Sequence, residues 1–396
     1  MFNSNLTHFL KWSHKLIMSR PKVIALYLPQ FHPMKENNEW WEPGYTEWTS
    51  VAKAKPLFKG HEQPKIPADL GFYDLRLSES RVAQAEFAKR AGVSAFCYYH
   101  YWFEGRQLME RPLNEVLKEG KPNFPFCLAW ANHDWYNKGW INSKKRIELV
   151  PKLLIKQTYG GVDDYTKHFY SLLKFFKDPR YYKLHGKLFF MIYAADSVPD
   201  LETFIATWKV LAEKEGLPGF YFITHFDRPS LYNRTDEFLA KGLDAINVSF
   251  LHRPFQTKFA KLLKKNKFLD LWYSRWQSHV HFAPEVVQYK NAIKKMDDVL
   301  FENDQIIPTI IPNWDHTPRS GRFGRVFQNS TPDLFKEHVN MILSRIKHKD
   351  VEDQVIVLKS WNEWGEGNYL EPDNKFGCQY IDMLNKCLTD FEKNKK

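Results

Sequence analysis

Short runs of apolar residues recur along the whole chain, with little alternation between apolar and polar positions inside each run. Continuous apolar runs of this kind are typical of strands that are buried on both faces of a parallel sheet. We interpret them as eight strands: Val23–Leu28, Val93–Tyr99, Phe124–Trp130, Lys187–Tyr193, Phe220–His225, Ala245–Phe250, Ile306–Pro312 and Val355–Ser360.

Segments with helical periodicity lie between most of these runs. Their apolar spacing predicts helices at Glu79–Arg90, Arg111–Lys118, Asp163–Lys177, Asp200–Glu215, Thr235–Lys241, Pro284–Val299 and Pro332–Ile346. Eight strands alternating with helices predict an α/β fold, a single (β/α)8 barrel of the TIM type. A doubly wound open sheet is the alternative. It is less favoured because no G-x-G-x-x-G motif follows the first strand and the chain contains no Walker A motif.

Two connections are longer than the repeat requires, and we predict long loops over residues 31–78 after strand 1 and 251–283 after strand 6. The second contains the basic stretch KFAKLLKKNKF at Lys258–Phe268. This stretch is either a solvated helix face or a peripheral contact with an anionic membrane. The sequence shows no internal repeat and no linker. We therefore expect a poorly ordered N-terminal extension over 1–20, one catalytic barrel domain over 21–390 and a basic tail over 391–396.

Charge and composition modify this picture in different ways. The 396 residues carry a net charge of +11, which favours acidic partners such as nucleic acid, anionic lipid or phosphorylated substrates. Aromatic residues make up 16% of the chain and include 14 Trp, which indicates a site that stacks on flat ligand faces. The four cysteines form no C-x-x-C pair, and no apolar stretch is long enough for a membrane span. We expect free thiols and a cytoplasmic protein, with the inner face of the membrane as a peripheral location.

Polar and aromatic residues concentrate directly after the predicted strands, where barrel enzymes build their active sites. Indole and phenol rings stack on the apolar faces of sugars while neighbouring polar groups bind hydroxyls, so the pattern predicts a glycan site. For the tryptophans the alternative is core packing, and for the histidines a structural role. The candidate substrate-binding residues are His32, Tyr101, Trp102, Trp130, Asn132, His133, His225, Trp314, Asp315, Trp361, Asn362 and Trp364.

Glu363 and Glu366 are the candidate catalytic residues, three positions apart in the sequence W-N-E-W-G-E-G after the last strand. Two close carboxyls in a Trp-walled pocket separate their pKa values, so that one stays protonated while the other ionises. Glycosidic-bond chemistry requires this division between a general acid and a base or nucleophile. The alternative is that one Glu caps a helix or pairs with an arginine. No H-x-x-H or H-E-x-x-H spacing occurs around His133, Asp134, Asp315 and His316, so we expect neither metal nor cofactor.

Several longer stretches carry a family resemblance. The chain resembles the WbsX-type polysaccharide-biosynthesis proteins, which are labelled glycosyltransferases and are distantly similar to the endo-mannosidases of glycoside hydrolase family 99. The resemblance runs from about Lys22 to Tyr380. It is carried by KVIALYLPQFHPMKENNEWWEPGYTEWTSVAKAKPLFKG (22–60), IPADLGFYDLR (66–76), FCYYHYWFEGRQLMERPLNEVL (96–117), IIPNWDHTPR (310–319) and SWNEWGEGNYLEPD (360–373).

The resemblance implies a (β/α)8 barrel in which Glu363 is a base that assists the sugar 2-hydroxyl, giving an anhydro-sugar intermediate, and Glu366 is the general acid. His133 stands where the family pattern usually has Glu, which changes the polarity of a sugar subsite. The expected function is formation or remodelling of glycosidic bonds in a cell-surface polysaccharide, lipopolysaccharide O-antigen or capsule.

Two alternative functions remain at this point. One is a retaining hydrolase similar to the endo-α-mannosidases, and the other is a non-catalytic module that binds sugar or nucleic acid. The expected partner is a glycan or a lipid-linked oligosaccharide. Nucleic acid is not expected, because the carboxylates among the strand-end tryptophans would repel a phosphate backbone.

Overall fold

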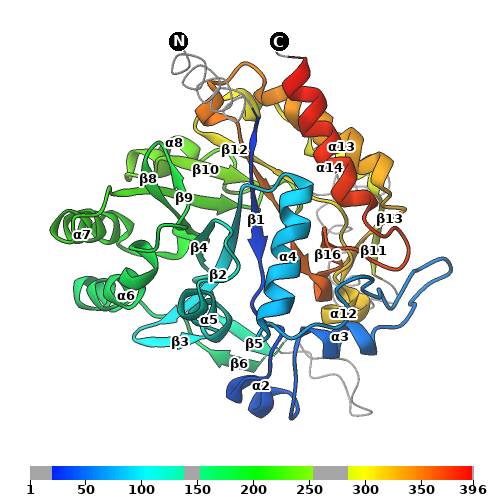
Figure 1. Ribbon diagram of the computed structural model, residues 1–396, viewed down its shortest axis with the longest axis horizontal. Helices are drawn as coiled ribbons and strands as arrows, with labels where there is room; N and C mark the ends of the chain where they lie inside the picture. The colour runs from blue at the N-terminus through cyan, green and yellow to red at the C-terminus, as the bar shows by residue number, and fades with distance from the viewer. Residues whose placement is uncertain (1–19, 138–151, 253–283, 395–396) are drawn as a thin grey trace, which may run out of the picture.

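Eight parallel strands close into a barrel in the computed structural model, which describes residues 20–137, 152–252 and 284–394 (Figure 1). Around the barrel the strand order is β1-β14-β12-β10-β9-β8-β4-β2, and β2 pairs with β1 to complete the circle. The predicted TIM-type barrel is confirmed. Its strands are β1 (Lys22–Tyr27), β2 (Ala95–Phe103), β4 (Phe126–Trp130), β8 (Lys187–Ile192), β9 (Phe220–Phe226), β10 (Ala245–Val248), β12 (Ile306–Ile310) and β14 (Val355–Leu358).

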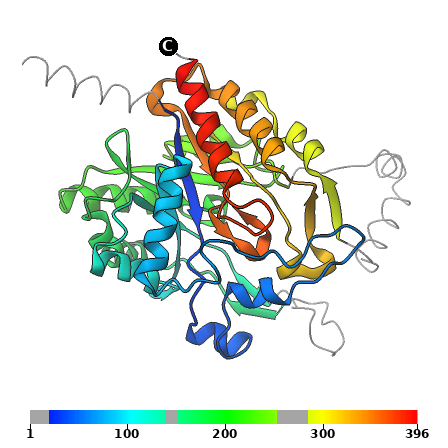
Figure 2. The same cartoon turned by 45° about the vertical axis from the view of Figure 1, so that its right-hand side comes forward.

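In the described part of the chain, each barrel strand is followed by a helix that packs on the outside of the barrel, and these helices range from six residues in α8 to sixteen in α6 (Figures 1 and 2). The last helix continues to Lys393, past the predicted domain boundary at residue 390. The eight helices are α4 (Ser78–Ala91), α5 (Arg111–Glu119), α6 (Gly161–Phe176), α7 (Leu201–Lys214), α8 (Thr235–Ala240), α11 (Tyr289–Met296), α13 (Pro332–Ile346) and α14 (Gln379–Lys393).

The segment predicted as one helix over Pro284–Val299 differs from the prediction. It begins as a strand, β11 (Glu285–Gln288), which pairs in parallel with β13 (Arg325–Gln328), and only then continues as α11. Six further short elements lie between the barrel strands and helices: β3 (Arg106–Leu108), β7 (Lys183–Leu184), η1 (Ala195–Ser197), η2 (Val299–Glu302), η3 (Gly321–Phe323) and η4 (Val351–Asp353).

The connections at the end of the barrel toward which β1 points carry most of the extra structure (Figure 1). Because every barrel strand runs in the same direction, these connections meet at one face. Their elements are α2 (Lys35–Trp40), α3 (Glu47–Lys53), β5 (Trp135–Asn137), β6 (Lys152–Ile155), α12 (Thr317–Ser320), β15 (Asn362–Glu363), η5 (Trp364–Glu366) and β16 (Asn368–Tyr369).

Two of the predicted segments cannot be compared with the structure. The basic stretch at Lys258–Phe268 and residues 1–19 of the N-terminal extension lie outside the described residues. None of the helices in the described part of the chain combines the length and the apolarity that a membrane crossing requires.

Trp208 of α7 shows how the outer layer is held against the barrel. Its side chain is fully buried, and its indole N–H donates to the Tyr165 carbonyl of α6 at 3.0 Å. The centre of its ring lies 4.7 Å from that of Phe190 in β8 and 5.2 Å from that of Phe220 in β9. One side chain therefore joins two helices to two strands.

We predict that Trp208→Ala lowers the free energy of unfolding by about 3–5 kcal/mol, because it leaves a large cavity in a region that cannot collapse. Val210→Ala in the same helix is the matched control, since Val210 is 66% exposed and an exposed substitution changes stability by about 0.5 kcal/mol or less. Urea denaturation followed by circular dichroism measures both. Equal losses in the two variants would contradict this role for Trp208.

Candidate active site

The two candidate catalytic carboxyls lie close together directly after β14. Glu363 ends β15 and Glu366 ends η5, and the antiparallel pairing of Glu363 with Asn368 turns the segment back on itself. Glu363 is only 3% exposed, and Glu366 lies close enough that its charge adds to burial in raising the pKa of Glu363. The structure thus brings together the two residues that the sequence singled out. We call residues 360–371 the catalytic loop.

An arginine from α12 anchors the catalytic loop. Arg319 Nη1 donates to Glu366 Oε1 at 2.5 Å, and its Nε and Nη2 donate to Glu47 Oε1 of α3 at 3.0 and 2.6 Å. The same Glu47 oxygen accepts the Gly365 N–H at 2.8 Å. A Cβ at position 365 would lie 2.1 Å from that oxygen, so only glycine permits this approach.

Lys359 supplies a second buried cation at the end of β14. Its Nζ lies 3.8 Å from Glu363 Oε1 and 3.5 Å from the Tyr193 hydroxyl, and it sits 5.7 Å from the centre of the Trp314 ring. Tyr99 lies close enough that the charge of Glu363 adds to burial in raising the pKa of its hydroxyl. Glu363 therefore faces a cation and a phenol inside the barrel mouth.

These surroundings separate the pKa values of the two carboxyls. Burial, and then the charge of Glu366, raise the pKa of Glu363 to about 8. Burial acts to raise the pKa of Glu366 too. The charge of Arg319, with help from His316 at 3.5 Å and Lys359, outweighs burial and holds that pKa well below its usual range. At neutral pH Glu363 is protonated and Glu366 is ionised, the reverse of the order that the resemblance implies for the reacting enzyme.

Four of the predicted substrate-binding residues lie around this pair. Tyr101 is close enough that the charge of Glu363 adds to burial in raising its pKa. Trp314 lies beside Lys359, His225 stacks on Tyr193 with ring centres 4.8 Å apart, and the ring of His133 is 6.4 Å from that of Tyr193. These residues come from the ends of β2, β4, β9 and β12 and lie at the same mouth of the barrel as the catalytic loop.

Trp102 and Trp130 instead pack on the outside of the barrel. Trp102 stacks on His168 of α6 at 4.9 Å and donates its indole N–H to Asp164 Oδ1 at 3.0 Å. Trp130 is fully buried and stacks on Phe204 of α7 at 5.4 Å. Alternate residues of a strand point to opposite sides, so these rings face the helices. The expectation that they contact substrate is corrected to one of core packing.

Trp361 and Trp364 belong to the catalytic loop, but their side chains are packed in the core and have no exposed surface. Trp361 packs on Phe96 at 5.2 Å. Trp364 stacks on Tyr369 at 3.7 Å and donates its indole N–H to Glu371 Oε2 at 2.6 Å. Their faces are not available to a sugar, so the expectation that they wall the site is corrected to support of the loop from the core.

The other predicted contacts are polar groups whose described partners are protein atoms. Asn132, Asn362 and Asp315 each join two segments near the strand ends, and His32 is held by a carbonyl three residues earlier, so these contacts position the strand ends. A role of the four side chains in binding substrate stays a prediction. Asn132 binds the Ala194 N–H and carbonyl, Asn362 binds both backbone groups of Leu28, Asp315 binds His61, Gln63 and Thr317, and His32 lies with Nδ1 3.0 Å from the Pro29 carbonyl.

Sequence reasoning missed Lys359, Arg319 and Glu47. Lys359 had a usable signal, because a lysine inside a buried strand requires a partner. Arg319 and Glu47 lie in segments without periodicity, and only the quoted family motifs around them marked these regions. Across the described residues, no group of three or more His, Cys, Asp or Glu side chains is placed to hold a metal ion.

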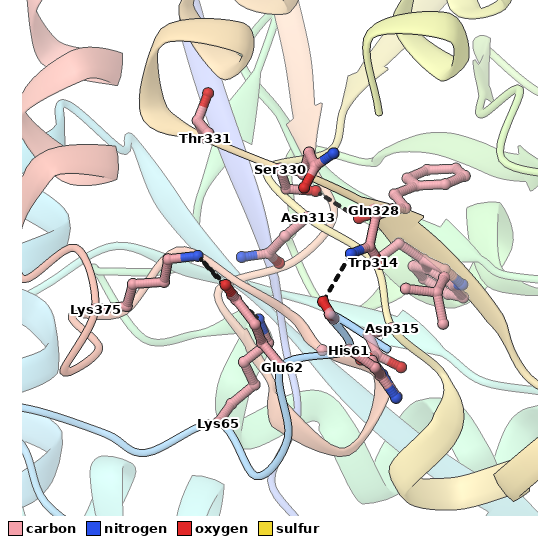
Figure 3. Close-up of a pocket in the computed structure, with 15 residues that line it drawn as sticks. His61, Glu62, Lys65, Asn313, Trp314, Asp315, Gln328, Ser330, Thr331 and Lys375 are labelled. Carbon is pink, nitrogen blue, oxygen red and sulfur yellow. Dashed lines mark hydrogen bonds and ion pairs between the residues drawn. The ribbon is translucent and has the colours of Figure 1, made fainter. Parts of the chain in front are cut away.

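A cavity of about 100 Å³ borders the loop that carries Glu366 (Figure 3). Trp314, Asp315 and Gly367 line it, and the Asp315 N–H donates to the Glu366 carbonyl at 2.7 Å. Four of the lining side chains bind one another in two pairs, Lys375 with Glu62 at 2.5 Å and His61 with Asp315 at 2.8 Å. The residues that line the cavity therefore help to hold the catalytic loop in place.

Comparison with known proteins now identifies the family. Residues 23–384 match the family model described as glycosyltransferase WbsX. This chain belongs to the WbsX glycosyltransferase family. The WbsX chain is also 29% identical over 372 residues to proteins named uncharacterized protein WxcX in two strains of Xanthomonas campestris pv. campestris. The match covers 93% of this chain and 49% of WxcX, so the chain spans about half the length of these curated relatives.

Solved structures with the same fold come from carbohydrate-active enzymes. A glycoside hydrolase-like protein matches with a TM-score of 0.55 and 14% identity, over 93% of this WbsX chain and 94% of the other. The GH99 endo-alpha-mannosidase from Bacteroides thetaiotaomicron matches with a TM-score of 0.54 and 14% identity, over 95% and 98%. At this identity the likeness shows the fold. Together with the family, it supports a carbohydrate-active role.

The raised pKa of Glu363 makes stability depend on pH. The folded state holds this proton until about pH 8, whereas an unfolded Glu releases it near 4.5, so the stabilisation from the proton is lost as pH rises between these values. Glu363→Gln keeps a neutral side chain at every pH. We therefore compare the melting temperature of the variant, minus that of the wild type, at two pH values. We predict that this difference is roughly 2–5 °C larger at pH 8.5 than at pH 5.

Scanning fluorimetry at the two pH values measures this difference. Glu213→Gln, at an exposed position of α7, is the control and should show the same difference from wild type at both pH values. A Glu363→Gln effect that does not change with pH would mean that Glu363 is ionised throughout.

Proposed function

We propose that this chain is an enzyme that forms or remodels glycosidic bonds of a cell-surface polysaccharide, with Glu363 and Glu366 as its catalytic carboxyls. The observation that carries the proposal is a pair of neighbouring carboxyls at the carboxyl end of β14, Glu363 buried and Glu366 largely buried, whose pKa values are shifted in opposite directions. Such a pair holds one proton at neutral pH, which is what acid–base cleavage of a glycosidic bond requires. WbsX-family membership supports the polysaccharide context.

Binding of a sugar would redistribute the shared proton. A hydroxyl that donates to Glu363 favours its ionised form, as does the Lys359 ammonium at 3.8 Å. The proton can then pass to the neighbouring carboxyl of Glu366. This transfer produces the order that the resemblance implies, with Glu363 as base and Glu366 as acid.

In the proposed reaction Glu363 removes the proton of the sugar 2-hydroxyl, and the freed oxygen forms a bond to the anomeric carbon. The bond from that carbon to the leaving oxygen breaks, and Glu366 gives its proton to the leaving oxygen. The anhydro ring is then opened by a second hydroxyl, with the proton transfers reversed. An acceptor sugar at this step gives transfer. Water gives hydrolysis, the second candidate function, because the same carboxyl pair serves both.

A site that only binds sugar or nucleic acid is disfavoured by the same observation. Burying two neighbouring carboxyls is unfavourable, and a binding module gains nothing from a proton held at a pKa of about 8. Mannose-containing glycans and lipid-linked oligosaccharides are the first substrates to test, with and without an acceptor oligosaccharide. The products then distinguish transfer from hydrolysis.

The two carboxyls should respond differently to the leaving group. We predict that Glu363→Gln and Glu366→Gln each lower kcat/KM on a natural glycan by about 10²–10⁴-fold, the usual contribution of general acid–base groups. With a glycosyl fluoride, whose leaving group needs no proton, Glu366→Gln should recover to within about tenfold of wild type and Glu363→Gln should not.

Glu213→Gln on α7 is the control for both substrates, since it lies away from the catalytic loop. Recovery of Glu363→Gln in place of Glu366→Gln would reverse the assigned roles. Wild-type rates in both variants would refute the proposal that these carboxyls are catalytic.

Activity should also fall on the alkaline side. The active form holds one proton on the carboxyl pair, and this proton is lost as pH rises through about 8. We predict that kcat/KM decreases roughly tenfold per pH unit above about pH 8.5. Stopped assays between pH 6 and 10, with circular dichroism at each pH to confirm folding, measure the profile. A constant kcat/KM up to pH 10 would contradict the shared proton.

A further inference from the structure

His225 lies at the end of β9, at the same mouth of the barrel as the catalytic loop. It is 3% exposed, and its ring stacks on Tyr193 with centres 4.8 Å apart and planes 28° from parallel. Its Nδ1 lies 2.5 Å from Asn247 Oδ1 of β10. The ring is therefore held in one orientation by a stacking partner and a hydrogen bond.

The surroundings of Asn247 determine which nitrogen of His225 carries the proton. Asn247 Nδ2 lies 2.9 Å from the Ile307 carbonyl and 2.9 Å from Thr309 Oγ1. A carbonyl can only accept, so the atom that faces Ile307 must be the amide NH₂ group. The Asn247 oxygen then faces His225 and can itself only accept. The proton consequently resides on His225 Nδ1.

His225 Nε2 is left as a hydrogen-bond acceptor. Burial lowers the pKa of His225 to about 4, outweighing the opposing charge of Asp227, so the ring is neutral at physiological pH. Nε2 is buried and has no hydrogen-bond partner among the described residues. An unpaired buried acceptor is unfavourable by about 1–3 kcal/mol. Binding sites retain such groups because they select ligands that supply the missing donor.

A hydrogen-bond donor, the Lys359 ammonium, is linked to His225 through Tyr193. The Lys359 ammonium contacts the hydroxyl of Tyr193, the residue on which His225 stacks, and it also lies 3.8 Å from Glu363 Oε1. The charge of Lys359 acts with burial to lower the pKa of His225. A sugar hydroxyl is the group that can donate to one partner while it accepts from another.

We propose that His225 Nε2 accepts a hydrogen bond from a hydroxyl of the sugar bound next to Glu363, with Lys359 donating to the oxygen of a hydroxyl there and Asn247 acting as a positioning residue. This inference rests on the proposed function. It defines the substrate class at this subsite as a sugar with a free hydroxyl facing β9. A sugar that is deoxygenated, methylated or acylated at that hydroxyl is rejected.

The tautomer can be tested without any substrate. Long-range ¹H–¹⁵N spectra of the full chain with ¹⁵N-histidine report the protonated nitrogen of each ring, and His225→Gln assigns the signal. We expect a proton on Nδ1 and a bare Nε2 between pH 6 and 8. In Asn247→Asp the facing carboxylate should raise the pKa of His225, so that Nε2 becomes protonated within this range. A proton on Nε2 of the wild type, or titration of the wild-type ring between pH 6 and 8, overturns the inference.

The hydroxyl contact can be tested by binding to the Glu366→Gln chain, which separates recognition from turnover. The probes are an α-linked mannose oligosaccharide and its monodeoxy analogues at the non-reducing residue, measured by calorimetry. We expect one analogue to bind about tenfold more weakly than the parent. After His225→Phe, which retains a ring to stack on Tyr193, the parent and that analogue should bind equally. His225→Gln, which can place an acceptor near Nε2, should restore part of the difference.

The outcomes also separate this inference from the proposed function. A difference between parent and analogue that survives His225→Phe overturns the acceptor role, as does equal affinity for all probes or binding of none. Loss of turnover in the Glu363 and Glu366 variants would still support the proposed function. Conversely, full turnover in those variants refutes the proposed function, while a His225-dependent difference would still show recognition of the hydroxyl.

Discussion

The fork of Arg319 between the carboxylates of Glu366 and Glu47 is the interaction on which the candidate site depends. Two neighbouring carboxyls at a buried position would both be pushed toward the neutral form by burial and mutual repulsion. Arg319 binds one member of the pair and not the other, so their pKa values separate. The acid–base division is therefore created by a residue from a different segment. Glu47 orients the guanidinium through two further hydrogen bonds.

The catalytic loop needs a rigid support, because Arg319 separates the two pKa values only while Glu366 is held at hydrogen-bonding distance from its guanidinium. The support comes from below, where Glu371 accepts hydrogen bonds from Trp364 Nε1 at 2.6 Å, Gln84 Nε2 at 2.6 Å and the Tyr73 hydroxyl at 2.9 Å. These donors come from the loop itself, from α4 and from the segment after α3. One buried carboxyl thus connects the loop to the helix layer and to the long connection after β1.

The barrel and the location of the candidate site could be predicted from the sequence. Which side chains point into the barrel and which point toward the helices could not. Buried parallel strands are apolar on both sides, so eight apolar runs suffice to count them. The same property hides which residues point inward. In β2, Tyr99 and Tyr101 interact with Glu363, whereas His100 and Trp102 pack with His168 of α6. An amphipathic strand would have shown this alternation in its sequence, and a strand buried on both sides cannot.

The aromatic excess illustrates the same limit. Trp130, Trp208, Trp361 and Trp364 are fully buried, which shows that much of the tryptophan content fills the volume between barrel and helices and the space beneath the catalytic loop. A buried indole gains free energy wherever there is apolar space, so its position says little about chemistry. A buried ammonium is different, because desolvation makes it unfavourable unless a specific partner compensates. Lys359, inside the last apolar run, is therefore stronger evidence for a site than the many tryptophans, since its burial is explained only by the carboxyl and the phenol that it faces.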